Sequence, residues 1–189
     1  MSTHKPDRTP PSKDPYRYRR AWSATARDAA SKRIREVLDS TSALLPAVEA
    51  VGEAFAEVMV AKTVTITLLD DDGYWDLVNI GDLPPEEVRF PNERYPASLY
   101  PTATARLLAR EGYISSDATM DVDAEHPHNS AWLGVGSFMG VPIVAAAEMR
   151  GEILVTRGAE APAFLLDDLA VAEDMATQFG ALLPGLQKD

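Results

Sequence analysis

Hydrophobic positions along the chain change their spacing several times, and each spacing predicts a different secondary-structure element. Two helical patterns come first, over about 23–39 and 46–61, where apolar residues recur every three or four positions. The first stripe is narrow and built mainly of small side chains, which suits close packing against another helix. The residues of the two stripes are Ala26, Ala30, Ile34 and Val37, then Leu44, Val48, Val51, Phe55, Val58 and Met59.

The rest of the chain predicts short strands, one internal helix and a long closing helix. Apolar runs on either side of Asp70–Gly73 predict a β-hairpin, and acidic residues at the start of the closing helix favour its N-terminal end. The expected elements are strands at 64–69, 74–80 and 88–90, a helix at 102–110, a strand at 113–116, a polar loop at 117–136 with one helical turn near 130–133, hairpin strands at 137–144 and 150–157, and a helix at 167–183.

The two ends of the chain differ in character from the body between them. Residues 1–21 are rich in charge, contain four prolines and show no hydrophobic period, which predicts a disordered basic arm. A leading helix is expected within 22–41. The main domain is expected over 42–185, and residues 186–189 form a short tail.

Composition narrows the kind of protein. Hydrophobic residues make up 46% of the 189 residues, which is enough for a folded core. No apolar run approaches the roughly 18 residues that would span a membrane, and the N-terminus lacks the apolar stretch of a secretory signal. The chain has no cysteine, so disulfides, thiolate metal sites and cysteine nucleophiles are excluded. These features predict a cytoplasmic protein with no membrane partner.

Charge is divided unevenly along the chain. Residues 1–38 carry ten basic and four acidic side chains, whereas the remaining residues carry eight basic and twenty-five acidic ones. A basic arm of this kind can contact nucleic acid or an anionic membrane, or it can lie on its own acidic body. Because the body would repel a phosphate backbone, any contact with nucleic acid is limited to the arm, and we expect no nucleic-acid partner.

Four short phrases of the sequence occur in a characteristic order. They are Gly112-Tyr113-Ile114 followed by Asp117, then Phe138-Met139-Gly140-Val141-Pro142-Ile143, then Arg150-Gly151-Glu152-Ile153-Leu154, and last Phe164 through Leu169. Together with the order of the expected elements, they resemble the GAF domain family of small-molecule sensors over about residues 43–185. The resemblance implies an α+β fold, in which a central antiparallel β-sheet has the terminal helices packed on one face and a ligand cavity on the other.

By family position, the walls of that cavity come from the middle segment, the polar loop and the strand that follows the loop. The resemblance therefore implies seven ligand-binding candidates, although aromatic and methionine side chains are also ordinary core residues. They are Tyr95, Tyr100, Asp117, His128, Trp132, Ser137 and Met139. Trp132 in particular can close an apolar cavity and donate a hydrogen bond from its indole nitrogen.

Several sharper chemistries of the family do not match this sequence. Methionine sulfoxide reduction and bilin attachment through a cysteine are excluded because the chain has no cysteine. The acids Asp167 and Asp168 lack the Asn-Lys pair that precedes such acids in cyclic-nucleotide-binding members. Haem held by His126 or His128 remains an alternative, although neither histidine has the family's spacing, and the cofactor is otherwise unknown.

Catalytic and metal-binding patterns are also missing from the sequence. There is no nucleophile elbow, because Gly136-Ser137-Phe138-Met139-Gly140 has the wrong spacing, and there is no phosphate-binding glycine-rich loop. No firm third ligand accompanies His126 and His128. We therefore expect a protein that is not an enzyme and has no metal site.

The sequence thus predicts a sensory or regulatory protein that binds an unidentified small molecule. No kinase, cyclase, phosphodiesterase or DNA-binding module fits in the residues outside the GAF-like region, so we expect it to act in trans on a partner protein. One alternative is a ligand-free interaction or dimerisation module, and a weaker one is a haem-binding redox or gas sensor. A homodimer through helices 23–39 and 167–183 is expected from the stripe of Ala26, Ala30 and Ile34.

Overall fold

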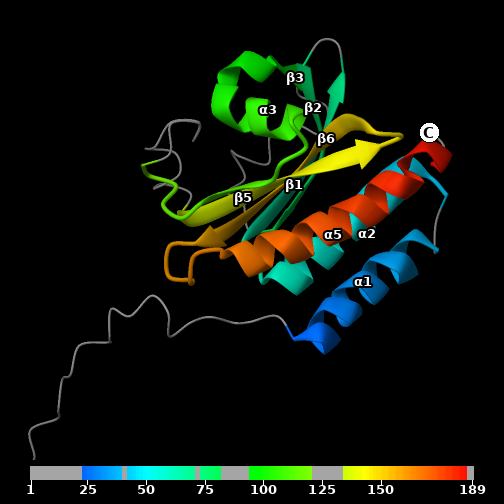
Figure 1. Ribbon diagram of the computed structural model, residues 1–189, viewed down its shortest axis with the longest axis horizontal. Coiled ribbons are helices and arrows are strands. Elements are labelled where there is room, and N and C mark those ends of the chain that lie inside the picture. Colours follow the sequence, from blue (N-terminus) through cyan, green and yellow to red (C-terminus); the bar gives the residue numbers. More distant parts are fainter. Residues whose placement is uncertain (1–22, 40–41, 71–72, 82–93, 121–133, 187–189) are drawn as a thin grey trace, which may run out of the picture.

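A six-stranded antiparallel sheet forms the centre of the computed structural model, which describes residues 23–39, 42–70, 73–81, 94–120 and 134–186 (Figure 1). Within these residues the strand order is β3-β2-β1-β6-β5-β4. The strands are β1 (Thr63–Asp70), β2 (Gly73–Gly81), β3 (Arg94–Tyr95), β4 (Tyr113–Ser115), β5 (Val135–Ala145) and β6 (Glu148–Gly158). Strands β1 and β6 are the two central strands, so they have paired neighbours on both sides.

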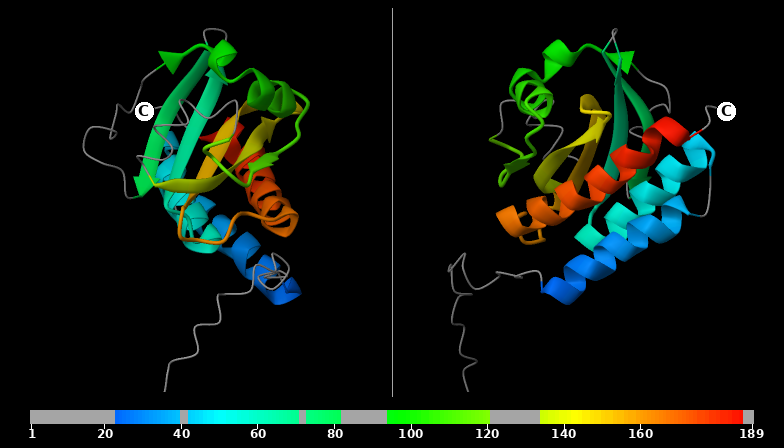
Figure 2. Two further views of the ribbon diagram at one scale, coloured as in Figure 1. Left: turned by 90° about the vertical axis from the view of Figure 1, so that its left-hand side faces the viewer. Right: turned by 45° about the vertical axis from the view of Figure 1, so that its right-hand side comes forward.

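In the described part of the chain, three helices cover one face of the sheet and a shorter helix lies on the other side. The helices are α1 (Ala24–Leu38), α2 (Leu44–Met59), α3 (Pro101–Leu108) and α5 (Leu166–Leu182), with 3-10 turns η1 (Ala97–Leu99) and η2 (Leu183–Gly185). Helices α2 and α5 pack directly on the strands, and α1 packs on both of these helices as an outer layer. Figure 2 shows α3 across the sheet from them. This arrangement confirms the predicted α+β class, with terminal helices on one face.

The helix-covered face of the sheet carries the hydrophobic core. Because side chains alternate between faces along a strand, every second residue of β1, β5 and β6 points toward α2 and α5. These residues have no exposed surface; they are Val64 and Ile66 of β1, Met139, Val141 and Ile143 of β5, and Ile153 and Val155 of β6. They pack against Val48, Val51 and Phe55 of α2 and Ala172, Met175, Ala176 and Phe179 of α5, which are also fully buried.

The small-residue stripe of α1 is used inside the chain. Ala30 is 2% exposed and Ile34 is fully buried, both in the core cluster that α1 forms with α2 and α5. The predicted close helix–helix contact is therefore present, but within one molecule. Ala30 and Ile34 are therefore not available for a contact between two copies, whereas Ala26 is half-buried and lies outside the core cluster. The homodimer itself stays a prediction.

An arginine at the end of β6 ties two helix ends to the sheet. Arg157 donates from Nη2 and Nε to the carbonyl of Met59 at 2.8 and 3.1 Å, at the C-terminal end of α2. Its Nη1 lies 3.3 Å from the carboxylate of Asp168 in the first turn of α5, where the two side chains are only 12% and 7% exposed. The guanidinium also stacks 4.0 Å from the centre of the Phe164 ring. One cation thus fixes the positions of α2, α5 and β6.

Most of the expected elements are present with shifted ends. Helix α2 begins at Leu44, earlier than expected, because Pro46 fits within the first turn, where its missing N–H is not needed. Pro142 pairs with Glu152 beyond the part of β5 that β4 covers, where its missing N–H leaves no bond to β4 unmade. The expected strand at 88–90, the helical turn at 130–133 and the arm at 1–21 lie outside the described residues. No helix in the described ranges is both long and apolar enough to cross a membrane.

The turn between β5 and β6 provides a test of backbone strain. Its two residues, Ala146 and Ala147, both have positive φ angles of 50° and 65°, and both are exposed. Two-residue hairpin loops with two positive φ angles prefer Asn-Gly, because a Cβ in this region costs about 1–2 kcal/mol. We expect the double variant Ala146→Asn/Ala147→Gly to raise the free energy of unfolding by about 1 kcal/mol, measured by urea denaturation.

The neighbouring alanine is the control for this substitution. Ala145 belongs to β5 and is 3% exposed, so Ala145→Gly should lower the free energy of unfolding. A double variant that is no more stable than the parent would show that the turn stores no such strain.

Candidate functional site

The face of the sheet away from α2 and α5 is lined largely by polar side chains. The registers place Thr65 opposite Asn79 and Leu154, and Thr67 opposite Asp76 and Glu152, on this face. We call this surface the polar face. It consists of Thr63, Thr65, Thr67, Tyr74, Asp76, Asn79, Glu152 and Thr156. Thr63, Thr67, Tyr74, Glu152 and Thr156 are at most 9% exposed, so these polar groups are buried and need hydrogen-bond partners.

Most hydroxyl groups of the polar face are paired across neighbouring strands. Each of the three threonines of β1 has a partner on the adjacent strand, either β2 or β6. The bonds are Thr63 Oγ1 with Thr156 Oγ1 at 2.6 Å, Thr65 Oγ1 to Asn79 Oδ1 at 2.6 Å, and Thr67 Oγ1 to Asp76 Oδ1 at 2.9 Å. Cross-strand pairs of this kind stabilise the sheet and fix the direction in which each side chain points.

Glu152 lies at the centre of the polar face and is only 8% exposed. The hydroxyl of Tyr113, from strand β4, donates to Glu152 Oε1 at 2.6 Å. This contact passes over Gly140 of β5, where an added Cβ would lie 2.2 Å from Oε1 and 2.3 Å from the Tyr113 ring. Gly140 is therefore required here for close approach, so it shapes the polar face as well as the packing of the sheet.

The surroundings of Glu152 favour its neutral form. Burial, with a smaller contribution from the negative charge of Asp76, raises the pKa of Glu152 to about 7 against the lowering effect of the Tyr113 hydrogen bond. Burial also raises the pKa of Tyr74, whose hydroxyl lies 3.0 Å from Thr104 Oγ1 of α3. The Tyr74–Thr104 contact joins the polar face to the helix above it.

A small apolar cluster borders the polar face at its β4 end. Phe138 and Ala118 are buried there, and the rings of Phe138 and Tyr113 meet edge to face, with centroids 6.2 Å apart. Ligand sites in proteins combine apolar walls with a few polar groups that orient the bound molecule. The polar face and this cluster together have that composition. In the described part of the chain, no three histidine, aspartate or glutamate residues lie close enough to hold a metal ion.

Two of the seven residues inferred from family position lie on the opposite side of the sheet. Met139 is fully buried in the helix-side core. Ser137 pairs with Arg157 and shares the side of Met139, and its Oγ has no hydrogen-bond partner among the described residues. Neither side chain contributes to the polar face.

The other five inferred residues do not share one environment in the structure. Asp117 is exposed and accepts hydrogen bonds from the Thr119 amide and hydroxyl, at 3.0 and 2.6 Å, which lower its pKa, so it caps a turn. Tyr100 is half-buried before α3, and the backbone of Tyr95 pairs with that of Tyr74. His128 and Trp132 lie outside the described residues.

The polar face was not predicted, although Thr63, Thr65 and Thr67 alternate with apolar residues along the sequence.

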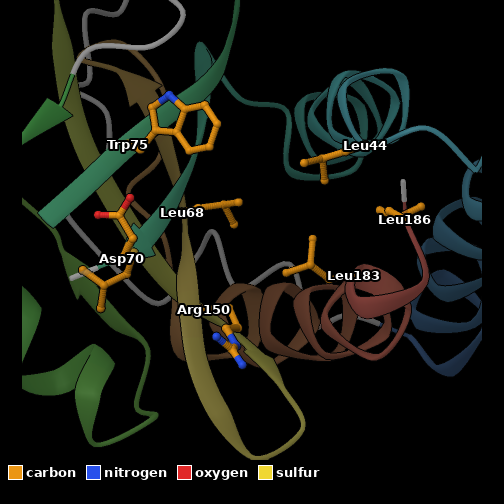
Figure 3. Close-up of a pocket in the computed structure, with 8 residues that line it drawn as sticks. Leu44, Leu68, Asp70, Trp75, Arg150, Leu183 and Leu186 are labelled. Atoms are coloured by element: carbon orange, nitrogen blue, oxygen red, sulfur yellow. The ribbon is translucent and has the colours of Figure 1, made fainter. Parts of the chain in front are cut away.

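A cavity lies on the helix side, at the end of the sheet where β1 and β2 meet. It has a volume of about 390 Å³ (Figure 3). The leucines Leu44, Leu68, Leu183 and Leu186 surround it together with Trp75, and the charged ends of Asp70 and Arg150 lie at its margin. Asp70 pairs with Arg94 at 2.6 Å and Arg150 with Glu148 at 2.5 Å. This cavity offers apolar contact and little directional chemistry, so it does not select a particular ligand.

Comparison with known proteins gives one family. The sequence profile of the GAF domain matches residues 47–183. No curated protein has a sequence similar enough to count as a match. These findings agree with the resemblance seen in the sequence.

Solved structures with the same fold come from several kinds of bacterial protein. The GAF domain of a phosphoenolpyruvate-protein phosphotransferase from Coxiella burnetii superposes with a TM-score of 0.68 at 16% identity, covering 86% of this chain and 95% of that one. The chromophore-binding domain of Stigmatella aurantiaca bacteriophytochrome gives 0.67 at 14%, covering 84% and 60%. A phycoerythrobilin-bound GAF domain from a cyanobacterial phytochrome gives 0.62 at 18%, covering 85% and 94%. At these identities the likeness establishes the fold.

The raised pKa of Glu152 predicts how stability depends on pH. Because the folded-state pKa of about 7 exceeds the ordinary value of 4.5, the folded chain binds this proton more tightly than the unfolded chain. The stabilisation is complete below pH 4.5 and is lost as the pH rises through 7. At about 1.4 kcal/mol per pKa unit, the loss is roughly 3 kcal/mol. Glu152→Gln should remove it, so this variant should be more stable than the parent at pH 8 and similar at pH 5.

Urea denaturation at pH 5, 6.5 and 8 measures this difference. Glu148 is exposed at the start of the same strand, so Glu148→Gln should retain the parental pH dependence. Equal pH dependence in the parent and in Glu152→Gln would contradict the assignment of this titration to Glu152.

Proposed function

The chain belongs to the GAF domain family, and from this premise we propose that it is a sensory or regulatory module that binds a small molecule on the polar face. The observation that carries the proposal is Glu152, a buried carboxyl group that lies outside the hydrophobic core and is held by Tyr113. Burying a carboxyl group costs stability. A polar face maintained at that cost, in a fold whose helices already have a complete core on the other side, is suited to recognition.

Two of the structural relatives support a ligand on this fold. One is described as bound to phycoerythrobilin and another as a chromophore-binding domain. A bilin joined through a cysteine is not proposed for this chain, which contains no cysteine. The ligand proposed here is therefore held by noncovalent contacts.

We propose binding in place of catalysis. The polar groups of the described face are arranged as cross-strand pairs that satisfy one another, such as Thr65 with Asn79 and Thr67 with Asp76. These hydroxyl groups hold the strands together, which supports a binding role. The bound state would be passed to a partner protein in the cytoplasm. The runner-up is a ligand-free interaction module, which the same fold allows if side chains of the chain itself fill the space above the polar face.

The homodimer is proposed with no surface assigned to it. Ala30 and Ile34 of the α1 stripe are buried against α2 and α5, so a dimer would not use these two residues. Light scattering at tens of micromolar protein should give twice the 20.5 kDa mass of the chain. A monomer at that concentration would rule out the dimer.

A thermal-shift screen of metabolites, together with native mass spectrometry of protein purified from cells, tests the proposed function. A ligand of the polar face should lose affinity when its hydroxyl groups are removed, by about 2- to 10-fold for each hydrogen bond. Tyr113→Phe and Thr67→Val remove one hydroxyl each with little change in shape. The control is Leu183→Ala in the apolar cavity, which should leave the affinity unchanged.

The outcomes of this screen separate the candidate functions. A ligand whose affinity responds to Leu183→Ala but to neither polar-face variant would move the site to the helix-side cavity. A screen with no ligand, combined with a bare mass in the native spectrum, would favour the ligand-free module. Haem would be detected by its visible absorption.

A further inference from the structure

The helix layer has an apolar surface at the end where α1 begins, α2 ends and α5 begins (Figure 1). A groove of about 600 Å³ runs there between α1 and the last turn of α2, and we call it the α1–α2 groove. Its apolar lining is Ala26, Ala29, Ala30, Val58 and Val60. Val60 also borders a smaller hollow of about 240 Å³ beside the start of α5, so this valine stands between two hollows.

The backbone of Val60 indicates that this surface is kept at a cost. Its φ and ψ angles are both 51°, in the left-handed region where glycine or asparagine usually ends a helix and a β-branched residue is disfavoured. Val60 is 63% exposed, so burial in the described fold does not offset the strain. Leu166, the first residue of α5, adds a second apolar side chain at 78% exposure. Exposed apolar surface of this kind marks a place of contact.

The chain segment directly before α1 has side chains that suit such a groove. Its sequence is Tyr-Arg-Tyr-Arg-Arg-Ala-Trp. Because alternate side chains of an extended chain point to opposite sides, Tyr16, Tyr18 and Trp22 share one side. Arg17 and Arg19 point to the other side, toward water and the acidic body. The segment therefore has an aromatic side, whose large rings gain from burial, and a basic side that stays solvated.

Connectivity and length place this segment beside the groove. Ser23 lines the groove and caps α1 by accepting a hydrogen bond from the Ala26 amide at 3.2 Å, so Trp22 is one peptide bond from the groove. From Ser23 to Glu36 the groove follows α1 for about 20 Å, at 1.5 Å per residue. Seven extended residues span about 23–25 Å, which matches this length. A tethered segment also has a high effective concentration, so a weak contact is enough to hold it.

We propose that residues 16–22 lie in the α1–α2 groove of the same molecule, with the Trp22 ring against Val60. A second copy is a poorer occupant, because a two-fold contact places the groove against itself and fills neither one. The inference is independent of the ligand of the polar face. It makes the segment an internal occupant that a partner protein must displace before it contacts this end of the helix layer.

The charges of the groove agree with aromatic occupancy. Lys32 pairs with Glu36, and Arg33 with Glu57, each at 3.3 Å. The two pairs balance, so the groove carries no net charge from these residues and selects neither an anion nor a cation. Apolar rings need no charged partner, and the arginines of the segment remain on its outer side.

A double-mutant cycle on the full chain tests the contact. Trp22→Ala should raise the equilibrium constant of unfolding about fivefold to tenfold in the parent, because the ring leaves the groove. In Val60→Asn, which suits the left-handed backbone but loses the apolar contact, the same change should have an effect of less than about twofold. Leu108→Asn is the matched control, since Leu108 is 58% exposed on α3, across the sheet. Trp22→Ala should keep its full effect there, as measured by urea denaturation.

Cross-linking tests the position of the segment, and the chain has no native cysteine to interfere. Arg20 is on the aromatic side of the segment, and Glu57 lines the groove from α2. Under mild oxidation, the pair Arg20→Cys and Glu57→Cys should form a disulfide within one molecule. The control pair is Arg20→Cys with Glu49→Cys, an exposed glutamate two turns earlier on the same helix. It should react more slowly by about fivefold or more.

Several results would overturn the proposal. Trp22→Ala could leave the parent unchanged, or it could act equally in the parent and in Val60→Asn. The two cysteine pairs could react at the same rate, or the disulfide could join two molecules, which would assign the groove to a segment of a second copy. If Val60→Asn fails to fold, Ala29→Lys replaces it in the cycle, because Ala29 is exposed and a lysine there puts a charge in the groove.

Discussion

The structure depends on a central sheet that is covered on both faces but has opposite chemistry on each. Along β1 and β6, apolar residues that point toward the helices alternate with polar residues that point to the other side. The apolar residues are Val64, Ile66, Ile153 and Val155, and the polar ones are threonines and Glu152. An apolar face is stabilised by burial alone, whereas each polar group removed from water needs a partner. The cross-strand hydroxyl pairs meet this requirement, and they also hold the polar face in one arrangement. A site formed by such a face is organised before any ligand arrives, which reduces the entropy lost on binding.

Arg157 holds the helices in position against the sheet. The last carbonyls of a helix have no partner within it, and the negative end of the helix dipole attracts a cation. Arg157 meets the carbonyl of Met59 at that end of α2 and reaches Asp168 in the first turn of α5. Asp168 also accepts from the amide of Leu165 at 2.9 Å, so the same carboxylate caps α5. These contacts lie at the opposite side of the sheet from Glu152, and they leave the polar face free of cations from the helix layer.

Sequence patterns predicted the fold well but did not predict the polar face, for a physical reason. Hydrophobic period identifies a helix or strand from neighbouring residues, so α1, α2, α5 and both hairpins were predictable. Which residues share a face depends on strand register, which joins residues as distant as Thr63 and Thr156. The family resemblance implied Ser137 and Met139 as ligand-binding residues, and both lie on the helix side of β5. The sequence places Glu152 only in a hairpin strand, because its burial depends on Tyr113 and Gly140 from two other strands.

Strand β6 connects the two faces of the sheet, and this connection gives the proposed ligand a short route to the helices. Glu152 faces the ligand side, and the next residue, Ile153, is fully buried in the core shared with α2 and α5. A packed core does not deform smoothly, so a shift of β6 at Glu152 displaces side chains that contact both helices. Tyr113 adds a second route, because the amide of the preceding Gly112 donates to Glu173 of α5 at 3.1 Å. A change of charge at Glu152 can thus reach α5 from two strands, so α5 is the element through which the polar face is physically best placed to act on a partner.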